Sequence, residues 1–117
     1  MKRNLSSATI KTPLLEIDGE LRGMLLSDRA RATAAVAIHL CLRIGHDYVF
    51  WRGSDKATLD AVTREIADAI WRVPLSTITQ FVKAEDKAGA TDAIAQEVLA
   101  GLTAAFEVQY VREPYGG

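Results

Sequence analysis

Residues 30–44 read ARATAAVAIHLCLRI, and this stretch decides the fold because almost every position in it is apolar. Ser27-Asp28, just before it, supplies an N-cap and an acidic residue in the first turn, where the helix dipole favours negative charge. A helix that is apolar nearly all round lies at the centre of a fold, enclosed by neighbouring helices or by a dimer partner. The stretch therefore predicts a central helix.

The central helix is expected to continue beyond Gly45, which would end or kink it. The aromatic residues that follow indicate that it resumes as far as Arg52, with Gly53 as the stop signal, so the whole helix would cover about residues 27–52. Alanine, which favours helix and close helix packing, accounts for 18 of the 117 residues. We predict an all-α fold, a compact bundle of four or five helices around this Ala-rich helix.

The composition is that of one globular domain, with 49% apolar and 25% charged residues. A net charge of −1 and a pI of about 6.1 disfavour nucleic acid or an anionic membrane as the main partner. The single cysteine, Cys41, excludes an intramolecular disulfide framework and lies in an apolar context that predicts a buried, inert thiol. With neither a signal peptide nor a membrane span apparent, we expect a cytoplasmic protein with no membrane association.

The two ends of the chain differ from its middle. Residues 1–11 lack periodicity and predict a flexible N-terminal arm, followed by a single helical domain over 12–110. Thr12-Pro13 predicts a helix start, and the apolar spacing continues to Leu25. Asp18-Gly19 within that segment leaves a β-hairpin open as the alternative. Residues 111–117 are predicted to be a C-terminal tail, and residues 106–110 alternate like a short strand.

Ala57–Val73 predicts an amphipathic helix, with Ser54-Asp55 as its cap and Pro74 ending it. Trp71 lies roughly 140° from the centre of the apolar stripe, on the charged face. A large aromatic residue there needs cover from elsewhere in the fold or from another molecule. That face carries charges of alternating sign at four-residue spacing: Asp60, Arg64, Asp68 and Arg72.

Arg64–Gly89 resembles a helix-turn-helix, the DNA-reading unit of many bacterial regulators. The resemblance implies that residues 76–83 form the reading helix in the major groove. Trp71-Arg72 stands where the motif has a glycine, and the reading segment is near neutral, whereas clustered Lys and Arg dominate DNA affinity. The residues that would face bases and phosphates are Ser76, Thr77, Thr79, Gln80 and Lys83.

Two further N-caps are predicted towards the C-terminus. Thr77 with Gln80 forms a capping box for a short helix that ends near Gly89. Thr91-Asp92 is expected to cap the last helix, whose apolar stripe extends to Phe106.

Nothing in the chain predicts catalysis or a cofactor. His39 and His46 are two helical turns apart, too far to share a metal ion, and we expect them on a polar edge with an Arg43–Asp47 pair. No nucleophile elbow, phosphate-binding loop or metal-ligand cluster is apparent in the sequence. We therefore expect a non-enzymatic protein without cofactor or metal.

The remaining hypothesis is a small regulatory or adaptor protein that binds another protein, as a homodimer. Dimerisation would bury leftover apolar surface of the central helix or the face of Trp71. Tryptophan and arginine are frequent anchors of protein interfaces. A helix-turn-helix regulator that binds DNA through Ser76–Lys83 is the alternative. The predicted partner-binding residues are Trp71, Arg72, Arg64, Asp68 and Phe50.

Overall fold

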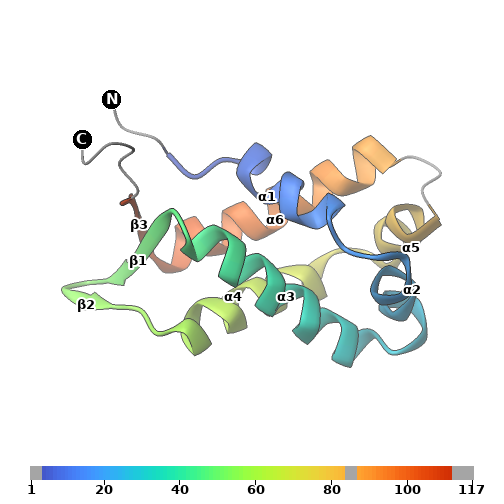
Figure 1. The fold of residues 1–117 in the computed structure, drawn as a ribbon, viewed down its shortest axis with the longest axis horizontal. Helices are drawn as coiled ribbons and strands as arrows, with labels where there is room; N and C mark the ends of the chain where they lie inside the picture. The colour runs from blue at the N-terminus through green and yellow to red at the C-terminus, as the bar shows by residue number, and fades with distance from the viewer. Residues whose placement is uncertain (1–3, 84–86, 112–117) are drawn as a thin grey trace.

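The computed structural model describes residues 4–83 and 87–111, which form a mostly helical, compact fold with a small sheet at one end (Figure 1). The fold is mostly helical and compact, as expected, but the described residues form six helices where four or five were predicted, and the all-α prediction omitted the sheet. The elements in chain order are α1 (Ser7–Leu15), α2 (Gly19–Ser27), α3 (Arg29–Gly45), β1 (Tyr48–Arg52), β2 (Asp55–Lys56), α4 (Leu59–Arg72), α5 (Leu75–Lys83), α6 (Lys87–Ala105) and β3 (Glu107–Tyr110).

Helix α3 packs against α1, α2 and α4, but one of its sides remains exposed, so the predicted enclosed central helix is only partly observed. The predicted continuation to Arg52 is wrong, because the chain turns after Gly45 and continues as β1. Burial in β1 alternates along the strand, with Tyr48 and Phe50 in the core. That period of two belongs to a half-buried strand, in which aromatic residues pack well.

The sheet has the strand order β2-β1-β3, and both pairings are antiparallel. Phe50 is opposite Val108 in the β1–β3 register, which confirms the strand-like alternation near residues 106–110. The β1–β2 turn contains Gly53 at φ +64°, a left-handed conformation that glycine adopts without steric cost. The sheet thus connects the exit of α3 with the exit of α6.

The N-terminal arm predicted for residues 1–11 is wrong over the part that the structure describes. Helix α1 begins at Ser7 and packs on α3 and α6, with Ile10 fully buried and Leu5 nearly so. Pro13, expected at the start of a helix, lies in the last turn of α1. The missed signal was the apolar spacing of residues 5, 10 and 14, which spans the proposed boundary.

Neither the continuous helix nor the hairpin predicted around Asp18-Gly19 forms. The chain instead breaks into α1 and α2, and the side chain of Asp18 accepts a hydrogen bond from the backbone N–H of Leu21 at 2.8 Å. An aspartate in this role satisfies one of the free N–H groups at a helix start. Asp18 therefore begins a new helix.

Helix α4 ends at Arg72, before Pro74, as predicted. Its N-cap is Thr58, whose side chain accepts a hydrogen bond from the Ala61 N–H at 3.1 Å. The predicted cap at Ser54-Asp55 was wrong, because these residues lie in the β1–β2 hairpin.

The other two predicted caps are also displaced. Thr77 lies inside α5, with its N–H bonded to the Pro74 carbonyl at 3.0 Å, and Thr91 is buried within α6. Over the described residues, no helix has both the length and the apolar character needed to cross a membrane.

Candidate protein-binding surface on α3 and α4

Helices α3 and α4 run antiparallel and side by side (Figure 1). At one end Arg29, in the first turn of α3, contacts the last residues of α4. At the other end the Cys41 thiol approaches the Leu59 carbonyl oxygen at 3.8 Å. The pair presents a continuous surface with two distinct parts, an apolar stripe on α3 and a charged face on α4.

Trp71 lies where these two parts meet, and 53% of its surface is exposed. The Arg29 guanidinium stacks over the indole at 4.7 Å from the ring centroid. The same guanidinium donates to the carbonyl oxygens of Trp71 at 3.1 Å and Val73 at 2.9 Å. Arg29 therefore covers the Trp71 ring from within the same chain, but only in part. The indole is fixed in position by Arg29 and still exposed to solvent.

The charged face of α4 is exposed along its length. Asp60, Arg64 and Asp68 are exposed, and Arg72 pairs with Glu97 of α6 at 3.3 Å. Among the described residues, no ion pair within 4.0 Å joins successive members of this series, although their four-residue spacing would allow it. Asp60, Arg64 and Asp68 are thus available to a second molecule, whereas Arg72 is already paired with Glu97.

An apolar stripe on α3 also remains uncovered. The side chains of Ile38 and Leu42 are 50% and 58% exposed, and Ala30 and Ala34 continue the stripe towards Trp71. The sequence predicted cover for this helix on all sides, by neighbours or by a partner. Within the described chain, neighbours cover only the opposite side of α3.

Four of the five predicted partner-binding residues come together on this surface: Trp71, Arg72, Arg64 and Asp68. Phe50 does not belong with them, because it is only 5% exposed and packs edge-on against Phe106 at 5.8 Å between centroids. Its position in β1 directs the Phe50 side chain into the core. The prediction for Phe50 was wrong because residues 48–52 were expected to be helical. Arg29, which organises the surface, was not among the predicted residues.

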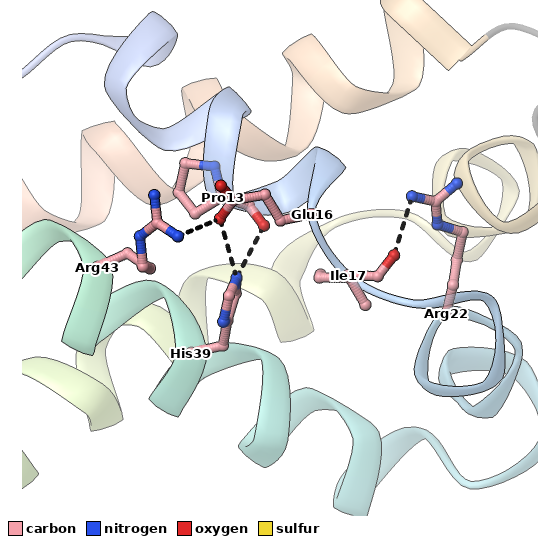
Figure 2. Close-up of polar contacts among 6 residues, drawn as sticks. All are labelled: Pro13, Glu16, Ile17, Arg22, His39 and Arg43. Atoms are coloured by element: carbon pink, nitrogen blue, oxygen red, sulfur yellow. Dashed lines mark hydrogen bonds and ion pairs between the residues drawn. The ribbon is translucent and has the colours of Figure 1, made fainter.

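A second polar cluster fastens α1 to α3 (Figure 2). His39 lies with its Nε2 atom 3.0 Å from the Pro13 carbonyl oxygen. Arg43 pairs with Glu16, the residue that follows α1, at 2.7 Å, where the sequence predicted a pair with Asp47. Arg22 in turn donates to the Ile17 carbonyl at 3.4 Å. The His39 and Arg43 contacts join α3 to the C-terminal end of α1, and the Arg22 contact joins α2 to the segment that precedes it, so all three have a structural role.

The residues of the helix-turn-helix alternative all lie on α5. Ser76, Gln80 and Lys83 are exposed, whereas Thr77 and Thr79 are half-buried and the Thr79 hydroxyl donates to the Leu75 carbonyl at 2.8 Å. In a helix-turn-helix, α4 would be the first helix and α5 would pack mainly on it. In this structure α5 packs on α2 and α6 instead. The packing of α5 therefore differs from that of the second helix of a helix-turn-helix.

An open pocket of about 280 Å³ lies between α3, the β1–β2 hairpin and the start of α4. It is lined by Cys41, Tyr48, Phe50, Lys56 and Val62, among others. Burial raises the pKa of the Cys41 thiol, and a hydrogen bond with Thr63 offsets only part of this effect. A neutral thiol is a poor nucleophile. Within residues 4–83 and 87–111, no cluster of three or more His, Cys, Asp or Glu side chains is arranged to hold a metal ion.

Comparisons with models of protein families, with curated proteins and with solved structures found no match to this chain.

Proposed function

We propose that the chain is a small, non-enzymatic regulatory or adaptor protein that acts by binding another protein and that forms a homodimer. The observation that carries the proposal is the state of Trp71, which is half-exposed yet held by Arg29 through stacking and two backbone contacts. An aromatic residue that is already ordered loses little conformational entropy on binding. Trp71 with Arg72 beside it has the composition of an interface anchor.

The α3 stripe supports the same proposal. Ile38 and Leu42 lie in the middle and at the end of a helix whose other side is packed into the core. Exposed apolar side chains that are grouped on one surface mark interaction sites more often than scattered ones do. A partner that covers α3 and α4 together would bury both the stripe and Trp71.

Light scattering coupled to size-exclusion chromatography tests the homodimer. The expected mass is twice the 12.8 kDa of one chain, and a single species of 12.8 kDa at every concentration would refute dimerisation.

Quenching of tryptophan fluorescence tests the surface. Trp51→Phe leaves Trp71 as the single tryptophan, and the dilute protein should be quenched readily by acrylamide. Association with a second copy or a partner should protect the ring. A Trp71 that is already protected in a verified monomer would contradict the proposal.

The DNA-binding alternative has its own test on α5. If the protein retards a DNA fragment at moderate salt, and Gln80→Ala with Lys83→Ala abolishes the shift, the alternative replaces the proposal. Both side chains are exposed, so the double variant is expected to fold.

A further inference from the structure

We infer that two copies of the chain associate through the charged face of α4, with the two helices antiparallel and centred at the level of Ile66. This inference rests on the homodimer of the proposed function and names the surface that forms it. It is carried by the order of charges on α4. Two copies of this helix bring opposite charges together only when they are antiparallel and in one register.

The series Asp60, Arg64, Asp68 and Arg72 is complementary to its own reverse. When two α4 helices lie antiparallel about the level of Ile66, Asp60 lies at the level of the partner's Arg72, and Arg64 at the level of the partner's Asp68. Two-fold symmetry repeats each pairing, as it must in an isologous interface. Arg72 already pairs with Glu97 of its own chain at 3.3 Å, so the outer contacts would share that cation, whereas the two central Arg64–Asp68 contacts join side chains that make no other ion pair in the described chain.

Other arrangements of the same two faces place like charges together. In a parallel pair, each residue meets its own copy, so Arg64 meets Arg64 and Asp68 meets Asp68. An antiparallel pair displaced by one turn brings Asp60 to the level of the partner's Asp68. Like charges held together across an interface disfavour that alignment, so the series selects both direction and register.

The surroundings of α4 fit this arrangement. Asp60, Arg64 and Asp68 are exposed and none is held in an ion pair within the described chain, so pairing with a second copy breaks no contact that they make. Trp71 lies about 7–8 Å along the helix from the centre. It faces the level of the partner's Ala61, whose small side chain leaves room for the indole.

Charge reversal at the two central positions tests the inference. Arg64→Asp places two aspartates at each central contact, and Asp68→Arg places two arginines there. Each single variant should raise the dissociation constant for self-association by at least about tenfold, measured by sedimentation equilibrium at low salt. Lys56→Glu, the same change of charge on the exposed hairpin, should leave the constant unchanged.

Mixing the two single variants separates pairing between copies from any effect on the isolated helix. In the mixture, the carboxylate introduced at position 64 of one variant meets the guanidinium introduced at position 68 of the other. A heterodimer should therefore form although neither variant self-associates well. The double variant, Arg64→Asp with Asp68→Arg, should also recover self-association. Circular dichroism confirms that each variant is folded.

The possible failures are distinct. A monomeric wild-type protein would overturn both this inference and the homodimer of the proposed function. A dimer that is insensitive to both single reversals would overturn α4 pairing but leave dimerisation through another surface. Weakened single variants that do not recover on mixing would show that residues 64 and 68 do not meet across the interface.

Discussion

Arg29 holds the end of α4 through two different interactions. Its guanidinium donates to the carbonyl oxygens of Trp71 and Val73, which have no partner within the helix, and its flat face stacks on the indole. Arg29 and Trp71 are 42 positions apart in the chain. Local periodicity predicts that Trp71 is exposed, but only the packing of α3 against α4 reveals what supports it.

Replacing Arg29 by alanine should lower the free energy of unfolding by about 1–3 kcal/mol, because two charge-assisted hydrogen bonds and one stack are lost. Trp71→Leu is the matched control, since it removes the stack but keeps both carbonyl acceptors, and should cost only about 0.5–1 kcal/mol. Urea unfolding followed by circular dichroism measures both. Equal losses would show that the carbonyl contacts contribute nothing.

Cys41 gives a prediction about pH. Burial raises the pKa of its thiol, so the folded protein keeps a proton that the unfolded chain loses at alkaline pH. The stability from this group is complete below the unfolded pKa of about 8.5 and is lost as the pH rises towards the higher folded value. The free energy of unfolding should therefore fall more steeply between about pH 8 and about pH 10 in the wild type than in Cys41→Ala. Parallel pH profiles would contradict this assignment.

At the scale of elements, α1 shows how tertiary contacts make a helix out of a weak local pattern. The helix has nine residues, a length that is marginal in isolation, and Pro13 removes one of its N–H donors. It is held by burial of Ile10 and Leu14 against α3 and α6 and by the His39 contact to the Pro13 carbonyl. Residues 4–11 therefore resemble an arm in sequence but contribute to the core.

Two substitutions in α1 test this point with similar chemistry. Ile10→Ala should lower the free energy of unfolding by about 2–4 kcal/mol, because Ile10 is 0% exposed. Leu15→Ala, at a position that is 46% exposed, should cost less than about 1 kcal/mol. Chemical denaturation gives both values. A flexible arm would instead make both changes neutral.

At the scale of the whole molecule, the elongated shape of 42 × 25 × 21 Å places α3 and α4 along one long side. That side combines an apolar stripe with a self-complementary set of charges. The two parts respond differently to salt, since screening weakens exposed ion pairs but not apolar burial.

Self-association should therefore weaken as the salt concentration rises from about 0.05 to about 0.5 M, a range over which screening shortens from roughly 14 to roughly 4 Å. Sedimentation equilibrium at each concentration measures it. Association that strengthens with salt would assign the dimer contact to Ile38 and Leu42 on α3 instead.

Features that depend on neighbouring residues could be predicted from the amino-acid sequence alone. The nearly continuous apolar run located α3, though not its end, and the apolar stripe located α4. Pro74 marked the end of α4, and the angular position of Trp71 placed it on the exposed face. Each of these follows from residues a few positions apart, for which helical geometry is sufficient.

Contacts between segments that are distant in the chain became known only from the folded structure. Residues 48–52 form a strand because β3, nearly 60 residues later, supplies the hydrogen-bonding partner, and this pairing moves Phe50 from the predicted surface into the core. Arg29 reaches Trp71, and α1 becomes part of the core, only once the helices have packed. The order of charges on α4 could be read from the sequence. Only the fold shows that no other part of the described molecule forms an ion pair with Asp60, Arg64 or Asp68, because helix packing determines which side chains remain exposed.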